Sequence, residues 1–230
     1  MRKNGIIIAI DGPAGVGKSS VGRDVASEIG YKFISSGKMY RAVAWLCVKN
    51  KINLNDEDSV LLVAQKNPIT FLNSGDVEPV LMVGGTKLQE ELYDENIAAA
   101  TSYVSRLRKL RNFLVEEQRR IGSDGGMIME GRDITTNVFP DAELKIYLDA
   151  SPEARAERRV AQLKGKGLEA NYDEILGMIK KRDEQDSRRE FNPLKRSDDS
   201  IYLDSTSLSK EEVANKIIEL YKATVKNLKK

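Results

Sequence analysis

Short, almost wholly apolar segments recur along the chain and alternate with longer segments of helical periodicity. The apolar segments have turn residues beside them, as buried strands do. They are residues 5–11, 31–35, 126–131, 143–149 and 200–204. The intervening stretches that place apolar residues three and four positions apart are 19–29, 38–50, 105–121 and 209–228. Strands that alternate with helices predict an α/β fold, in which helices cover both faces of a five-stranded parallel sheet.

One region departs from this alternation. Residues 68–92 contain turn signals at Asn73-Ser74-Gly75 and at Gly84-Gly85, which favour a small antiparallel unit. We therefore expect residues 65–105 to form an insertion between the second and third core strands. Residues 1–64 and 106–230 would then form the core domain.

The amino-acid composition excludes several types of catalytic and metal site. The chain of 230 residues has no histidine, which excludes Ser-His-Asp catalysis, Cys-His catalysis and every His-ligated metal site. Its single cysteine, Cys47, lies in the apolar run AVAWLCV, where we expect a small buried hydrophobe, and no internal disulfide is possible. A net charge of +2, from 37 basic and 35 acidic residues, argues against nucleic acid as a partner.

Hydropathy and the start of the chain bear on its location. No apolar run approaches the roughly 18 residues of a membrane span. The apolar run before Asp11 is too short for a signal peptide. We therefore expect a cytoplasmic protein without a membrane partner. A monomer is expected because no coiled-coil heptad is visible.

The strongest local motif is GPAGVGKS, which matches G-x-x-x-x-G-K-[ST] in full. It follows an apolar strand and opens a helix, so that backbone N–H groups and the helix N-terminus can face one anion. Lys18 would reach the outer phosphates of ATP, and the Ser19 hydroxyl would ligate Mg²⁺. The expected ATP-binding residues are Gly12, Pro13, Ala14, Gly15, Val16, Gly17, Lys18, Ser19 and Ser20.

Two arginines follow core strands and indicate where a second anion binds. Arg41 comes after the second strand and Arg132 after the third. Ligands of open α/β sheets bind outside the carboxyl ends of the strands, so both arginines would face one crevice. A salt bridge from Arg132 to the neighbouring Asp133 is the alternative for that residue. A GTPase is disfavoured because NKII at 215–218 lacks the aspartate of a guanine-reading motif.

Taken together, these segments make the chain resemble the bacterial cytidylate kinases, which are P-loop nucleoside monophosphate kinases. The resemblance rests on IAIDGPAGVGKSS, ISSGKMYRAVAW, LRNFLVEEQRR, EGRDITTNVFPDAELKIYLDAS, KKRDEQDSRR and LDSTSLS, and spans about residues 6–210. It implies transfer of the γ-phosphoryl group of ATP to CMP or dCMP with Mg²⁺, in a three-layer P-loop kinase fold. That fold would carry an inserted monophosphate-binding domain at 65–105 and a lid at about 153–172.

The resemblance also implies residue roles. The cytosine would be surrounded by Ser36, Arg111, Asp133 and Arg189. The acceptor phosphate would be held by Arg41 and Arg132, and the sugar by Ser102, Arg182 and Asp186. Around Arg155, Arg158 and Arg159 the lid would close over ATP, and the catalytic residues would be Lys18, Arg132, Arg155 and Arg159.

The sequence departs from the family pattern at a few positions. Thr135 stands where the family usually has glycine, and a β-branched residue would be strained there if φ were positive. Ser20 replaces a frequent threonine but keeps the hydroxyl. Glu130 is an acid of the expected kind to which we assign no role.

The charged run KKRDEQDSRRE, residues 180–190, can be a solvated helix face or a ligand-binding one. On a helix, Arg182, Asp186 and Arg189 fall on one stripe, which we expect to face the nucleoside. The helix would end at Asn192-Pro193, and the other charges of the run would lie in water.

Two other functions remain as alternatives. One is another small P-loop kinase, acting on UMP, AMP or shikimate, against which the pattern at Ser36, Arg111, Asp133 and Arg189 argues. The other is a non-catalytic nucleotide-binding regulatory module, against which the intact Lys18 argues.

Overall fold

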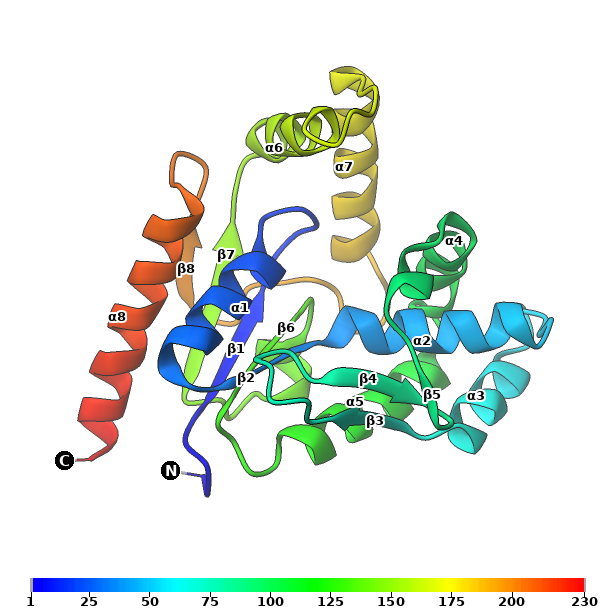
Figure 1. Cartoon of the computed structure of the whole chain (residues 1–230), viewed down its shortest axis with the longest axis horizontal. Helices are drawn as coiled ribbons and strands as arrows, with labels where there is room; N and C mark the ends of the chain where they lie inside the picture. Colours follow the sequence, from blue (N-terminus) through cyan, green and yellow to red (C-terminus); the bar gives the residue numbers. More distant parts are fainter. Residues whose placement is uncertain (1, 230) are drawn as a thin grey trace.

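A parallel sheet forms the centre of the molecule (Figure 1). The structure is a computed structural model that describes residues 2–229. In spatial order the five strands are β2 (Lys32–Ser35), β6 (Met127–Gly131), β1 (Ile7–Asp11), β7 (Leu144–Asp149) and β8 (Ile201–Asp204). Each neighbouring pair is parallel. The α/β class and the five predicted strands are confirmed.

Alternate side chains of the central strand β1 enter two different cores. Ile8 and Ile10 pack in a buried cluster with side chains of α1 and α8, whereas Ile7 and Ala9 pack on the opposite face with α5 and η2. The sheet is thus the middle of three layers. Its covering elements are α1 (Lys18–Ile29), α8 (Lys210–Leu228), α5 (Arg108–Gly122) and the single π-helical turn η2 (Ile134–Val138).

Local sequence accounts for where two of the outer helices begin. Ser151 accepts a hydrogen bond from Ala154 N, and Pro152 occupies the first helical position of α6. Ser209 and Glu212 form a reciprocal capping box at the start of α8. No helix within residues 2–229 combines the length and the apolarity needed to cross a membrane.

A second, smaller substructure lies beside the sheet. It contains an antiparallel three-stranded sheet in the order β3-β4-β5, in which β4 and β5 join through Gly84 and Gly85. One hydrophobic cluster joins this sheet to α2, α3, α4 and α5, so the inserted residues share their core with flanking helices. Its elements are α2 (Ser36–Lys49), α3 (Glu57–Lys66), β3 (Ile69–Leu72), β4 (Val80–Val83), β5 (Thr86–Lys87), η1 (Glu90–Tyr93) and α4 (Glu95–Val104). The division into domains at 65–105 stays a prediction.

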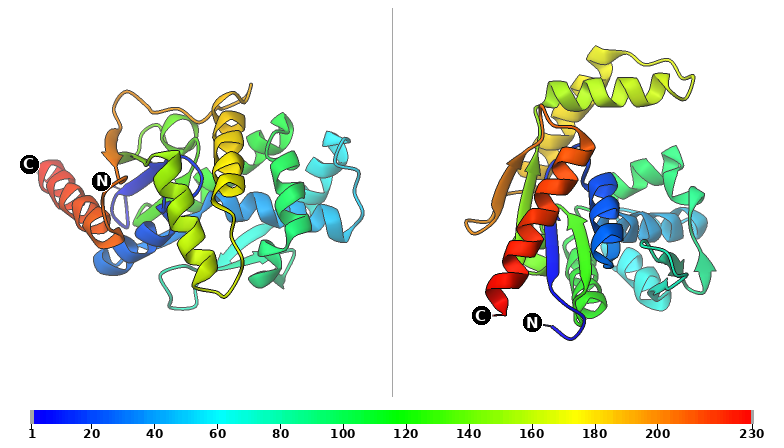
Figure 2. Two further views of the ribbon diagram at one scale, coloured as in Figure 1. Left: turned by 90° about the horizontal axis from the view of Figure 1, so that it is seen from above. Right: turned by 60° about the vertical axis from the view of Figure 1, so that its left-hand side comes forward.

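Two helices stand over the carboxyl ends of the core strands (Figure 2). They are α6 (Pro152–Lys164) and α7 (Tyr172–Ser187). The expectation that α7 extends to Asn192-Pro193 is wrong. The chain turns back after Ser187, where Leu194 N donates to Asp186 O (2.8 Å) and Asn192 adopts a φ of 51°.

Candidate active site

The phosphate loop connects β1 to α1 at the centre of the sheet. Gly15 and Gly17 have φ of 76° and 100°, a region that glycine enters without strain. At Gly12 a Cβ atom would lie 1.9 Å from the Leu148 carbonyl oxygen, so only glycine allows this close approach of loop and strand. These conformations turn the loop into the N-terminus of α1, where peptide dipoles favour an anion.

Lys18 lies folded into this loop and is only 5% exposed. Its ammonium group donates to Gly12 O (2.8 Å) and Pro13 O (2.7 Å). Burial lowers the pKa of Lys18 to about 7, and the positive charge of Arg132 acts in the same direction. A phosphate anion beside it would reverse both effects, because it favours the charged ammonium.

Glu130, to which sequence alone gave no role, connects the loop to the end of β6. Its Oε1 accepts hydrogen bonds from Ser19 Oγ (3.0 Å) and from Ser35 Oγ (2.6 Å). A hydroxyl and a carboxylate therefore lie together at the start of α1. These are oxygen donors of the kind that Mg²⁺ takes alongside substrate phosphates.

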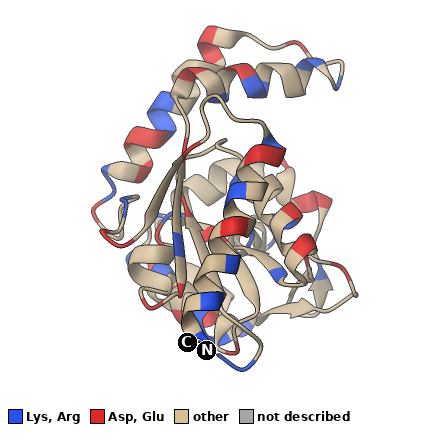
Figure 3. Cartoon of the chain, turned by 90° about the vertical axis from the view of Figure 1, so that its left-hand side faces the viewer, with Lys and Arg blue, Asp and Glu red and all other residues tan. Residues whose placement is uncertain are grey.

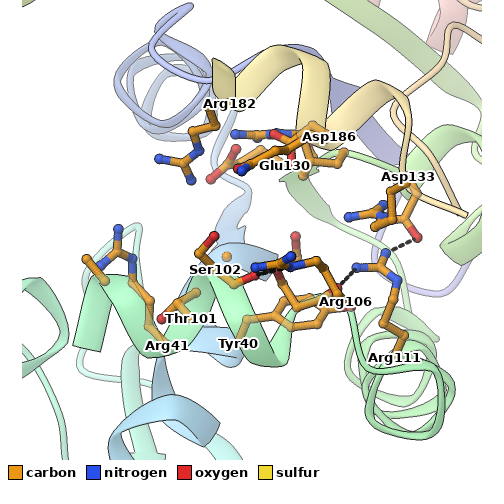
Figure 4. Close-up of a pocket in the computed structure, with 18 of the residues that line it drawn as sticks. Tyr40, Arg41, Thr101, Ser102, Arg106, Arg111, Glu130, Asp133, Arg182 and Asp186 are labelled. Carbon is orange, nitrogen blue, oxygen red and sulfur yellow. Dashed lines mark hydrogen bonds and ion pairs between the residues drawn. The ribbon is translucent and has the colours of Figure 1, made fainter. Parts of the chain in front are cut away.

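A cavity of about 290 Å³ opens beside the loop (Figure 4). It lies between α2 and α4 on one side and α7 on the other, above the end of β6. All nine residues that the resemblance assigns to the acceptor nucleotide line it: Ser36, Arg41, Ser102, Arg111, Arg132, Asp133, Arg182, Asp186 and Arg189. The structure thus brings this predicted set together, although residue-by-residue roles stay predictions.

Two ion pairs, one buried and one half-buried, lie in the wall of the cavity. Arg111 donates to Asp133 Oδ2 at 2.7 Å, and both side chains are at most 8% exposed. Burial would lower the pKa of Arg111, but the facing Tyr40 and Asp133 outweigh it and raise that pKa. Arg132 Nε donates to Asp186 Oδ2 at 2.7 Å, not to the adjacent Asp133. Burial opposes ionisation of Asp186, yet Arg132 holds the pKa of that carboxyl below its usual value.

The cavity nevertheless keeps an excess of positive charge. Its lining has seven cationic and three carboxylate side chains. Burial and the nearby Arg132 lower the pKa of Arg182, and burial and Arg111 lower that of Arg189. Elsewhere basic and acidic residues are intermixed along the helices (Figure 3), so the excess is local. Such a site favours a polyanion.

Four of the seven lining cations form no ion pair within residues 2–229: Arg41, Arg106, Lys181 and Arg182. Two of them, Arg41 and Arg182, are placed to bind a phosphate. Arg41 is oriented by a hydrogen bond to Leu92 O (2.8 Å). Both guanidinium groups point into the cavity (Figure 4) and can bind phosphate oxygens in pairs.

The three arginines of the predicted lid lie outside this cavity. Arg155 is buried and donates to both oxygens of Asp183 (2.6 and 3.0 Å) and to Ala14 O of the phosphate loop (3.0 Å). Arg158 donates to the Ser205 carbonyl oxygen, and Arg159 is exposed beside Gln162. Contact of Arg155 and Arg159 with a transferred phosphoryl group stays a prediction.

The charged run 180–190 differs from the expected pair of faces. Arg189 lies beyond the end of α7, where its guanidinium donates to Phe191 O (2.8 Å) and lies 4.0 Å from Asp133 Oδ1. It therefore reaches the cavity through the turn after α7 and not through a helical stripe. The expectation that the remaining charges lie in water is wrong for Asp183, which is half-buried and binds Arg155. Lys181 is exposed as expected, although it also lines the cavity.

Asp11, at the end of β1, is a buried group whose role was not foreseen. It accepts hydrogen bonds from Ile134 N (2.9 Å), Thr135 N (2.7 Å) and Thr135 Oγ1 (2.7 Å). The φ of Thr135 is not positive, so the strain considered for a β-branched residue does not arise. Asp11 therefore ties the phosphate-loop strand to η2, the turn that follows Arg132 and Asp133. The sequence feature that could have indicated this role is the position of an acidic residue at the end of an apolar strand.

Replacing Thr135 with valine should destabilise the protein more at high pH than at low pH. Burial raises the pKa of Asp11 to about 6, whereas the bonds from Thr135 and Ile134 lower it. Because this pKa exceeds the unfolded value of 3.8, the contribution of Asp11 to stability falls as pH rises from about 4 to 6. Valine removes a donor to the ionised form, so we expect a loss of about 2 kcal/mol at pH 8 and about 1 kcal/mol at pH 5.

Urea denaturation at the two pH values measures this difference. Thr135→Ser keeps the hydroxyl and should stay close to wild type at both. An equal loss for Thr135→Val at both pH values would show that the hydroxyl does not act on the Asp11 charge.

Comparison with known proteins agrees with this site. A family model described as cytidylate kinase matches residues 8–223. A cytidylate kinase of Caldicellulosiruptor bescii is 44% identical over 96% of this chain and 98% of its own length. Cytidylate kinases of Bacillus pumilus and Bacillus subtilis are 41% and 40% identical, over 94% and 92% of this chain and 96% and 94% of theirs. The chain belongs to the cytidylate kinase family.

Proposed function

We propose that this protein transfers the γ-phosphoryl group of ATP to CMP or dCMP, giving ADP and the corresponding diphosphate. The observation that supports this most directly is the strongly cationic cavity beside the phosphate loop, whose Asp133 carboxylate faces inward. A phosphate binds at the cations, and a carboxylate accepts from the exocyclic amine that distinguishes cytosine from uracil. The two sites lie at the carboxyl ends of neighbouring strands, β1 and β6.

The chemistry requires positioning more than proton transfer. An acceptor monophosphate is already an oxyanion near neutral pH, so no general base is needed in a chain without histidine. Lys18 and the loop amides would hold the outer phosphates of ATP, while Arg41 and Arg132 would hold the acceptor phosphate in line. Arginines suit this because they stay charged and bind phosphate oxygens bidentately.

We also propose Mg²⁺ as the cofactor. Ser19 Oγ and, next to it, Glu130 would hold the ion or its water ligands at the start of α1. When bound, Mg²⁺ neutralises charge on the phosphates of ATP. Chelation of the metal should therefore abolish transfer, and added Mg²⁺ should restore it.

A coupled assay of ADP release tests the proposed function. Purified protein with ATP and Mg²⁺ should turn over CMP and dCMP, and should turn over UMP, AMP and shikimate far more slowly. Preference for one of the last three would replace our proposal with another small-molecule kinase, and inactivity with all five would favour a regulatory module. The cytoplasmic location and the monomeric state stay predictions.

A further inference from the structure

Arg106 is a cavity-lining arginine that none of the assignments above uses. It lies in the short connection between α4 and α5 and is four residues beyond Ser102. Figure 4 shows its guanidinium on the floor of the cavity, between Ser102 and Arg111. It is therefore adjacent both to a proposed sugar contact and to a proposed base contact.

The side chain is held in place but keeps donors free. Arg106 Nε donates to the Ser102 carbonyl oxygen at 3.0 Å, and the guanidinium carbon lies 5.7 Å from the centre of the Tyr103 ring. Within residues 2–229 it forms no ion pair, whereas Arg111 and Arg132 are paired with carboxylates. Because an arginine has five N–H donors, its two terminal nitrogens remain for a ligand.

The position of Arg106 determines which atom of a bound nucleotide can accept its hydrogen bond. Under the proposed function, the base lies toward Arg111 and Asp133, and the sugar lies toward Ser102. The hydrogen bond to the Ser102 carbonyl oxygen holds Arg106 at the sugar end of the cavity. The sugar atom that accepts hydrogen bonds and differs between the two acceptors is the 2′-hydroxyl, which CMP has and dCMP lacks.

We propose that Arg106 is a specificity-determining residue that donates a hydrogen bond to the 2′-hydroxyl of the acceptor nucleotide. It thereby favours CMP over dCMP. This inference rests on the proposed function, because it requires a cytidine monophosphate in the cavity. A hydrogen bond from a charged donor is worth enough to change affinity by about tenfold or more.

Dissociation constants for CMP and dCMP, measured by isothermal titration calorimetry, test this role. For Arg106→Ala we expect CMP binding to weaken about tenfold and dCMP binding to change less than about twofold. Arg188→Ala is the matched control. Arg188 carries the same charge but lies outside the cavity, 79% exposed and paired with Glu184, so its removal should leave both constants unchanged.

The outcomes distinguish a failure of the proposed function from a failure of the proposed role of Arg106. Wild-type protein that binds neither nucleotide refutes the proposed function itself. Wild-type binding with equal losses for CMP and dCMP in Arg106→Ala, or with no loss for either, overturns the role of Arg106 alone. Arg106 is exposed, so we expect the melting temperature of the variant to match that of wild type.

Discussion

Replacing Lys18 with alanine is expected to slow phosphoryl transfer about 10³-fold while the protein stays folded. Lys18 is the one ammonium group inside the described phosphate loop, and its two carbonyl partners, Gly12 and Pro13, belong to that loop. Alanine removes the charge that would face the outer phosphates. The fold should survive because burial already disfavours the charged lysine. Initial rates with ATP and CMP, together with circular dichroism, measure both parts.

The pH dependence of ATP binding tests whether the charge of Lys18 is what binds the outer phosphates of ATP. Its pKa of about 7 in the free protein means that ATP must bind with uptake of a proton at higher pH. Wild-type affinity should then fall by up to about tenfold per pH unit above pH 7, and Lys18→Ala should lack this dependence. Lys216→Ala, at an exposed position of α8, is the control and should behave as wild type. Near-normal turnover of Lys18→Ala would contradict a role of Lys18 in phosphoryl transfer.

Local sequence was enough to predict the strands and the phosphate loop. Each core strand is a short apolar run beside turn residues. The glycines of GPAGVGKS permit the backbone conformation that a phosphate loop needs. The carboxyl ends of parallel strands share one edge of the sheet, so Arg41 and Arg132 could be placed near the loop without coordinates. The cavity contains both.

What sequence could not supply were contacts between distant segments. Thr135 and Asp11 are 124 residues apart, and nothing local to either predicts their hydrogen bond. Arg155 and Asp183, 28 residues apart, pair because α6 and α7 lie against each other. Arg106 looked like any surface arginine until the turn between α4 and α5 directed it into the cavity.

The end of α7 shows a tertiary contact that local signals do not reveal. No glycine or proline interrupts KKRDEQDSRRE, so the first evident breaker is Asn192-Pro193. In the structure, Arg189 instead turns toward Asp133 and binds the Phe191 carbonyl. The helix ends where the chain folds back, with Leu194 N bonded to Asp186 O and Arg189 bonded to Phe191 O, and the sequence pattern did not reveal these contacts.

Replacing Asp133 with asparagine is expected to remove the preference for CMP over UMP. Asp133 Oδ2 accepts from Arg111 (2.7 Å) and from Asn137 (3.2 Å), while Oδ1 is 4.0 Å from Arg189 and remains for a ligand. A carboxylate there accepts from the amine of cytosine and repels the carbonyl of uracil. An asparagine can present its amide nitrogen at the Oδ1 position, where it donates to uracil and opposes cytosine.

The expected change in specificity is large because the substitution removes a hydrogen bond to cytosine and adds one to uracil. The ratio of kcat/KM for CMP to that for UMP should fall by about 10² or more. Asparagine keeps an oxygen for Arg111, so the ion pair is replaced by a hydrogen bond and the buried guanidinium is not left without a partner. Asp58→Asn, which changes an exposed carboxylate outside the cavity, should leave the ratio unchanged. An unchanged CMP-to-UMP ratio in Asp133→Asn would mean that Asp133 orients Arg111 and does not contact the base.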